Sequence, residues 1–185
     1  MSKLELKIAG CIALINAALF IPVGLGVLYY SAGTVTSMTK TVLSILTVLS
    51  TGVLVYLVLT LKRYVQKAFN FHEIDQAAGA IIVAAILYAA NDIVATLVGQ
   101  STMLNNINIG LLVYLGLANI YFAFKFNKLE DNLFGLRKSY CVLTAATGAL
   151  LASVFLSPLY VIPGLVSDIM LGTMFLLASK EARVA

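Results

Sequence analysis

The chain has 185 residues, of which 61% are hydrophobic and 11% are charged, and its net charge at pH 7 is +4. Soluble domains carry about 25% charged residues, so a chain this apolar could not keep its surface in water. The composition therefore excludes an ordinary soluble protein and predicts an integral membrane protein without a separate soluble domain. The basic residues lie at the ends of apolar segments rather than in one cluster, which argues against nucleic-acid binding.

The apolar segments, taken in chain order, predict transmembrane helices, each of which needs about 20 apolar residues. The first segment follows two lysines but exceeds the roughly 7–15 residue core of a signal peptide, so we expect a retained span. The last apolar region is too long for one crossing. Pro158, Pro163 and Gly164 predict a break within it, with a re-entrant hairpin as the alternative. The predicted spans are residues 8–30, 41–61, 77–98, 107–124, 139–158 and 161–179.

An equal spacing of Gly10, Gly79 and Gly148 indicates an internal repeat. Each glycine lies near the start of an odd-numbered span, as it would in three parallel helix hairpins around one axis. The alternative is chance, because small residues are frequent in all membrane helices. We therefore predict an all-α bundle of six transmembrane helices in a single domain of residues 1–185, with three hairpin repeats as one way to build it.

Small residues at a spacing of four mark the faces on which membrane helices approach one another. They occur at Ala13 and Ala17 in the first span, at Ala80 and Ala84 in the third, and around Gly148 in the fifth. We expect these faces to pack within the chain. Contact with other membrane subunits is the alternative.

The distribution of Lys and Arg predicts how the chain lies in the membrane. Of the 12 basic residues, only Lys40 falls on the side of the predicted membrane opposite to both termini. Because cytoplasmic loops carry an excess of Lys and Arg, we predict a multi-pass protein of the plasma membrane with cytoplasmic termini. Lipid is an expected partner, since each basic side chain near anionic head groups contributes about 1 kcal/mol. The residues predicted to contact the lipid surface are Lys62, Arg63, Lys67, Arg137 and Lys138.

Two carboxylates lie inside predicted spans, Asp92 in the third and Asp168 in the sixth. A charge at the centre of a span costs about 2.5–3.5 kcal/mol on insertion scales, and such residues usually face the bundle interior. A rise of about 1.5 Å per residue places both acids in the outer third of the membrane, at nearly the same level. One hypothesis is that they bind a cation or a small solute; the other is that each reaches water, head groups or a backbone donor. The other residues of this predicted site are Asn91, Tyr88 and Thr96.

A second polar level is predicted in the inner half of the bundle. Asn16 in the first span and Asn119 in the fourth both fall there when counted from the predicted ends of their helices. They would form an inner polar relay that continues the path from the two acids.

Enzyme chemistry has little support in this sequence. It contains no HExxH, GxSxG or P-loop motif, its single His72 lies in a connection, and Cys11 and Cys141 fit no disulfide or metal pattern. We therefore expect no catalysis, no cofactor and no metal site. Short loops and the absence of a soluble head favour a non-catalytic accessory, anchoring or assembly subunit of a membrane complex. The two acids favour the alternative, a small permease or a transporter substrate-binding subunit.

Overall fold

The computed structural model describes residues 1–31, 37–99 and 101–181, with side chains described throughout these ranges except at 23–31, 37–40 and 43. Each predicted span overlaps one α-helix, and most of the helices extend into the flanking polar residues. The elements are α1 (Lys3–Ser31), α2 (Ser37–Phe69), α3 (Asp75–Val98), α4 (Thr102–Phe126), the short 3-10 helix η1 (Leu133–Gly135), α5 (Arg137–Ala152), the 3-10 helix η2 (Ser157–Tyr160) and α6 (Val161–Lys180).

The described part of the chain is built from helices, and five of them are long and apolar enough to cross a membrane. This agrees with a multi-pass membrane protein. The exception among the α-helices is α5, which has 16 residues. At about 1.5 Å per residue it rises about 24 Å, which is short of a hydrocarbon core of about 30 Å. The predicted sixth crossing therefore does not follow from helix length.

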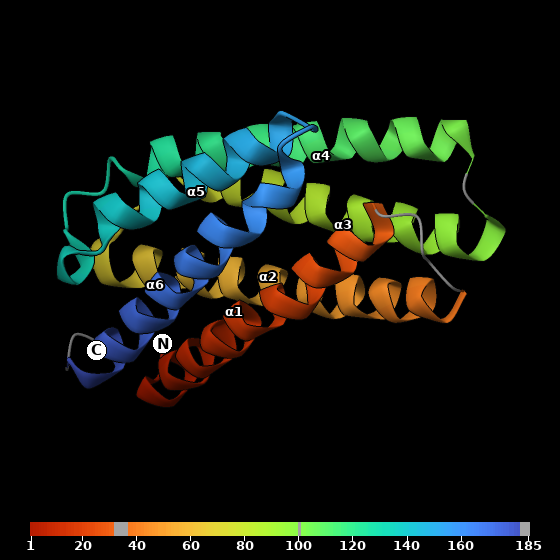
Figure 1. Ribbon diagram of the computed structural model, residues 1–185. Coiled ribbons are helices and arrows are strands. Elements are labelled where there is room, and N and C mark those ends of the chain that lie inside the picture. The colour runs from red at the N-terminus through yellow and green to blue at the C-terminus, as the bar shows by residue number, and fades with distance from the viewer. Residues whose placement is uncertain (32–36, 100, 182–185) are drawn as a thin grey trace.

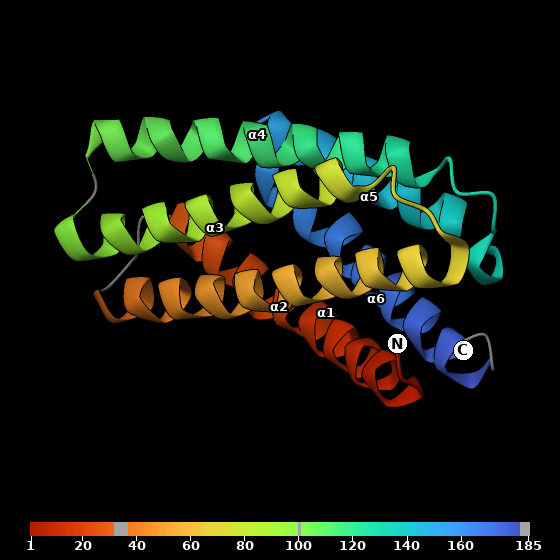
Figure 2. The ribbon, with the colours of Figure 1, turned by 180° about the vertical axis from the view of Figure 1, so that it is seen from behind.

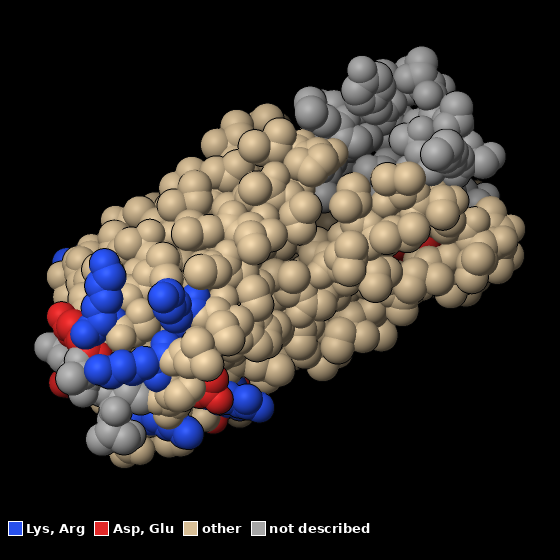
Figure 3. Space-filling model, turned by 90° about the horizontal axis from the view of Figure 1, so that it is seen from below, with Lys and Arg blue, Asp and Glu red and all other residues tan. Residues whose placement is uncertain are grey.

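The helices form a closed ring. Each α-helix packs on its neighbours in sequence, and α1 packs on α6 to complete the circle. The start of α1, the end of α6, the α2–α3 connection and the α4–α5 connection lie at one end of the bundle (Figures 1 and 2). Lys and Arg gather at this same end (Figure 3), which we call the basic end. The grouping of these connections and helix ends agrees with the sequence prediction.

The hydrophobic core fills the half of the bundle nearest the basic end. Its largest fully buried side chains come from the start of α1 and from the parts of α2, α4 and α6 that reach this end, and they include Leu6, Leu61, Phe126 and Phe175. Phe126 stacks on Phe122, with ring centroids 5.6 Å apart. Packed side chains therefore close the ring of helices at the basic end.

Glycines permit two close helix crossings. Gly10 of α1 faces Gly172 of α6, and Gly116 of α4 faces Gly148 of α5. A Cβ atom added at Gly116 would lie 2.5 Å from the carbonyl oxygen of Gly148, so the two backbones are in direct contact. The small-residue face around Gly148 is thus used within the chain. A Cβ at Gly79 would have no neighbouring atom within 4 Å, so the equally spaced glycines do not share one packing role, and the repeat stays a prediction.

Ion pairs hold the connections together at the basic end. Glu73 contacts Lys128 at 3.1 Å and Lys125 at 3.6 Å, which ties the α2–α3 connection to the end of α4. Hydrogen bonding to Lys128, together with the charges of both lysines, lowers the pKa of Glu73. Asp75 accepts hydrogen bonds from Gln66 at 2.8 and 2.9 Å, and Ile74 is the N-cap of α3.

The five basic residues predicted to contact lipid lie at this end but differ in their surroundings. Lys62 is half-buried and pairs with Asp75 at 3.6 Å. Arg137 is half-buried and donates to the backbone oxygen of Asp131 at 3.3 Å. The exposed members of the set are Arg63, Lys67 and Lys138.

The break between α5 and α6 differs from the sequence prediction. Helix α5 ends at Ala152 rather than at residue 158, and Val154 takes a left-handed conformation with φ of 57°. Pro163 and Gly164 belong to the start of α6 rather than to the break. A proline is tolerated there because the first amides of a helix have no partner within it. The helices α2, α3 and α4 extend well beyond this turn (Figures 1 and 2).

Candidate functional site

A cavity of about 510 Å³ lies inside the ring and is lined by residues of all six α-helices and η2. Its lining reaches Gly99 and Asn105 where α3 meets α4, at the end of the bundle opposite to the basic end. The hydrophobic core borders it on the other side through Phe122 and Ile81. Small-molecule sites in proteins typically measure about 300–1,000 Å³, so the space suits a small solute better than a bare ion.

Asp92 forms a polar cluster between α2 and α3. The hydroxyl of Ser44 donates to Oδ2 of Asp92 at 3.0 Å and lies 2.6 Å from the hydroxyl of Thr96. Thr96 in turn donates to the backbone oxygen of Asp92 at 2.9 Å. These contacts hold the carboxylate at the cavity wall by means of hydroxyl groups.

Asp168 forms a second cluster between α6 and α1. The amide nitrogen of Asn16 donates to Oδ2 of Asp168 at 2.5 Å. Asn16 is 3% exposed. Next to Asp168 in sequence, Ser167 lies with its hydroxyl 3.3 Å from that of Thr144 on α5. Polar side chains of α1, α5 and α6 therefore line this part of the cavity.

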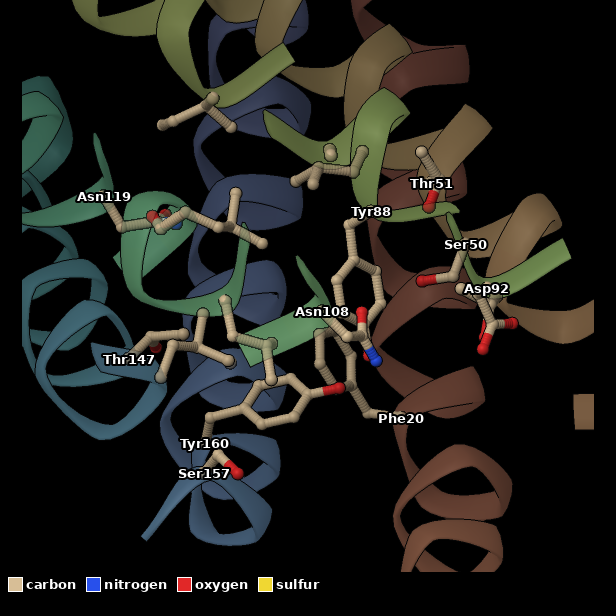
Figure 4. Close-up of a pocket in the computed structure, with 18 of the residues that line it drawn as sticks. Phe20, Ser50, Thr51, Tyr88, Asp92, Asn108, Asn119, Thr147, Ser157 and Tyr160 are labelled. Atoms are coloured by element: carbon tan, nitrogen blue, oxygen red, sulfur yellow. Dashed lines mark hydrogen bonds between the residues drawn. The ribbon is translucent and has the colours of Figure 1, made fainter. Parts of the chain in front are cut away.

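Three aromatic side chains, those of Phe20, Tyr88 and Tyr160, line the same cavity (Figure 4). The rings of Phe20 and Tyr160 meet edge to face with centroids 6.0 Å apart. Tyr88 of α3 and Asn108 of α4 line the same cavity. In Figure 4 these four side chains gather in the middle of the view, and Asp92 lies to one side of them.

The cavity has buried hydrogen-bond acceptors, and its described lining has no positively charged side chain. The amide oxygens of Asn16 and Asn108 are buried and have no hydrogen-bond partner among the described groups. Among the described residues that line the cavity there is no Lys, Arg or His. A buried acceptor without a donor costs about 1–3 kcal/mol, so a molecule with hydrogen-bond donors could satisfy these two oxygens.

Neither protein-family models, nor curated proteins, nor solved structures yield a match to the chain.

The residues predicted from the sequence as a binding site and relay all line this cavity except Asn91. The amide of Asn91 donates to the backbone oxygen of Leu104 at 3.2 Å and so links α3 to α4. Asn119 lines the cavity, but its amide donates to Leu115 of its own helix at 2.8 Å. Asp92 and Asp168 are thus the charged residues in the described lining of the cavity.

The predicted levels of the polar residues are wrong in two respects. Asn16 contacts Asp168 directly, so it does not belong to a separate inner level. Helix α1 begins at Lys3 rather than at residue 8, which places Asn16 further along the helix than predicted. Asp92 and Asp168 are also not level with each other. Tyr88 and Tyr160 line one part of the cavity (Figure 4), and from there Asp92 lies four residues toward the outer end of α3, whereas Asp168 lies eight residues along α6 toward the basic end. Asp168 therefore lies nearer the basic end than Asp92.

Several cavity residues were not singled out in the sequence, although a signal for some of them exists. Along α2 the polar residues Ser44, Thr47 and Thr51 recur at the spacing of one helix face and line the cavity. Asn105 and Asn108 lie three residues apart on α4 in the same way. A polar stripe at helical spacing inside an apolar segment could have indicated the cavity. Aromatic residues in a membrane helix carry no comparable signal.

Proposed function

We propose that this protein binds a small cationic solute in the cavity, as a permease or as the substrate-binding subunit of a transporter. The observation that carries the proposal is that Asp92 and Asp168 line one cavity whose described lining contains no basic side chain. Buried charges in proteins are usually paired or coordinate an ion. A cationic solute would supply the missing charge.

The shape of the site supports uptake from the end opposite to the basic end. The cavity lining reaches the ends of α3 and α4 there, whereas Phe122 and the rest of the core close the other side. A solute that entered would pass Asp92 first and then reach Asp168. We propose that the basic end and both termini face the cytoplasm of a plasma membrane, as the excess of Lys and Arg predicts, so that this conformation admits solute from the exterior.

The accessory or assembly function favoured by the sequence stays a prediction. One of its arguments has become weaker, because Gly10 packs against Gly172 and Gly116 against Gly148 inside the ring. These glycines therefore contact helices of the same chain and do not form a surface on which a partner helix could pack. The cavity, in contrast, is a specific feature that solute binding explains.

Neutralising either acid should abolish cation-dependent stabilisation. The purified protein in nanodiscs is heated with a panel of inorganic and organic cations and with neutral solutes of similar size. A solute at roughly 100 times its Kd should stabilise the wild type by about 2.7 kcal/mol, and Asp92→Asn and Asp168→Asn should lose most of this shift. Glu130→Gln, at an exposed carboxylate outside the cavity, is the control. Equal stabilisation of all variants, or stabilisation by neutral solutes alone, would contradict the proposal.

The α5–α6 hairpin is proposed to turn inside the outer part of the bilayer, while α1 to α4 cross it fully. Its turn exposes apolar side chains, and Phe155 is 95% exposed. Amides of the turn find acceptors within it. That of Leu156 donates to the hydroxyl of Ser153 at 3.3 Å, and that of Leu159 donates to the backbone oxygen of Leu156 at 2.9 Å. Backbone at membrane depth requires such internal partners.

Cysteine labelling of intact cells should separate this topology from six full crossings. Single cysteines are placed at Thr102, Glu130 and Phe155 after Cys11 and Cys141 have been replaced by serine. With a membrane-impermeant maleimide, Thr102→Cys should react from outside and Glu130→Cys only after permeabilisation. Phe155→Cys should resist this reagent on both sides, because the turn is in lipid. Reaction of Phe155→Cys from outside would instead establish six crossings, and reaction of Glu130→Cys from outside would reverse the orientation.

A further inference from the structure

We infer, building on the proposed solute binding, that the ligand is an organic ammonium ion with an apolar or aromatic body. Its charged head would lie beside Asp168 and Asn16, and its body against Phe20 and Tyr160. The inference rests on how α1 and α6 combine a carboxylate, an unpartnered amide oxygen and two aromatic rings in one wall of the cavity.

Helical spacing places these groups on one wall. On α1, Asn16 and Phe20 are four residues apart, and on α6, Gly164 and Asp168 are four residues apart, so each pair shares one helix face. Tyr160 immediately precedes α6 and continues this face. Along the wall, Phe20 is therefore roughly one helical turn of about 5.4 Å from the carboxylate, and Tyr160, eight residues before Asp168, is roughly two turns from it. These distances fit one small amphipathic molecule.

Gly164 allows the ring of Phe20 to approach the α6 backbone. A Cβ atom at this position would lie 3.0 Å from Cε1 of Phe20. The ring is thus held between Tyr160 and the first turns of the helix that carries Asp168, and it borders the cavity. Aromatic rings attract cations within about 6 Å of their centroids, and the interaction strengthens when the cation is desolvated.

The acceptors around Asp168 match an ammonium head group. Such a group has three N–H donors and no acceptor. Here the Asp168 carboxylate supplies negative charge, and the Oδ1 atom of Asn16 is a buried acceptor without a described partner. The hydroxyls of Thr144 and Ser167 line the same cavity and can accept further bonds. A neutral solute would leave the carboxylate uncompensated.

A bare metal ion fits these features less well. Calcium takes about six to eight oxygen ligands at about 2.3–2.6 Å, and the described residues contain no group of three His, Cys, Asp or Glu side chains that could hold a metal ion. The cavity volume of about 510 Å³ and its aromatic wall would also be unused by a metal. An ammonium with an apolar body uses both.

The test compares charged and neutral forms of one molecular shape on the intact protein in nanodiscs. Calorimetric titration uses 2-phenylethylammonium, its neutral analogue 2-phenylethanol, methylammonium, sodium and magnesium. For the wild type, 2-phenylethylammonium should bind at least about tenfold more tightly than 2-phenylethanol, since hydrogen bonds between charged groups are stronger than those of a neutral hydroxyl. It should also bind more tightly than methylammonium, because only the larger ion reaches the rings.

Two variants locate the head and the body of the ligand. Asp168→Asn should weaken 2-phenylethylammonium binding by about tenfold or more. Phe20→Leu should weaken 2-phenylethylammonium severalfold and leave methylammonium nearly unchanged, because the ring contacts only the body. Glu130→Gln should bind like the wild type. The comparison of the charged and neutral ligands on the wild type stands even where a variant fails to fold.

The outcomes distinguish this inference from the function on which it rests. If sodium or magnesium binds and both ammonium ions do not, the inference is overturned and cation binding stands. If 2-phenylethanol binds as tightly as 2-phenylethylammonium, or if Phe20→Leu weakens both ammonium ions equally, the assignment of head and body is overturned. If none of the cations binds, both the inference and the proposed function are lost.

Discussion

Replacing Gly116 by alanine should destabilise the bundle by about 1–3 kcal/mol, because it overpacks a crossing at which two backbones touch. The new Cβ would lie 2.5 Å from the carbonyl oxygen of Gly148 and 2.6 Å from the amide nitrogen of Ala152. Both are backbone atoms, so no side-chain rotation can relieve the contact. Helices α4 and α5 would have to separate, and unfolding of the purified protein by SDS titration should report the loss of stability.

The same helix provides a matched control at Gly110. A Cβ added there meets no atom within 4 Å, so Gly110→Ala should be neutral or should stabilise the protein by up to about 1 kcal/mol through better helix propensity. Because both substitutions add one methyl group to α4, their difference isolates the crossing. Equal free energies of unfolding for the two variants would show that α4 and α5 do not approach as closely as the structure indicates.

Replacing Asn16 by leucine should also be costly, by about 1–3 kcal/mol, because it leaves the carboxylate of Asp168 without the donor that contacts it. The amide nitrogen of Asn16 lies 2.5 Å from Oδ2 of Asp168. When Asp168→Leu is added, the second change should cost much less than it does alone, since replacing both partners by apolar groups removes the unsatisfied charge. A double-mutant cycle of unfolding free energies measures this coupling.

Asn119 offers the comparison for this cycle. It also lines the cavity, but its amide donates to Leu115 in its own helix at 2.8 Å. Asn119→Leu should therefore show no coupling to Asp168→Leu beyond about 0.5 kcal/mol. Additive costs for Asn16→Leu and Asp168→Leu would mean that the α1–α6 contact does not stabilise the bundle. A coupling as large at Asn119 as at Asn16 would point to a general effect of apolar substitution in the cavity.

The glycine pair and the Asn16–Asp168 pair affect the shape of the cavity as well as the stability of the bundle. Gly116 and Gly148 set the distance between α4 and α5, whereas Asn16 and Asp168 fasten α1 to α6, and the cavity is lined by all four helices. A change at either position therefore alters the walls against which a solute would lie. Variants used in binding experiments should consequently be matched for thermal stability before their affinities are compared.

Much of the candidate site could be anticipated because polar residues are rare in these spans. Asp92, Asp168 and Asn16 each stand out from apolar surroundings, and a costly polar group in lipid is expected to turn inward. Their mutual arrangement could not be anticipated in the same way. The depth of a residue depends on where its helix begins and ends, and α1 begins earlier and α5 ends earlier than the sequence predicts. The contact of Asn91 with Leu104 could not be predicted either, because it depends on where α4 lies relative to α3.

The sequence by itself determined that this chain is helical with segments apolar enough to cross a membrane, approximately where its helices lie along the chain, and which of its connections share the basic end. These properties follow from the free energy of transferring each segment out of water, which depends mainly on local composition. Only the tertiary structure decided that the helices close into a ring with a cavity on one side and a packed core on the other. That outcome depends on contacts between distant residues, such as Gly116 with Gly148 and Asn16 with Asp168, and on a turn that ends α5 early.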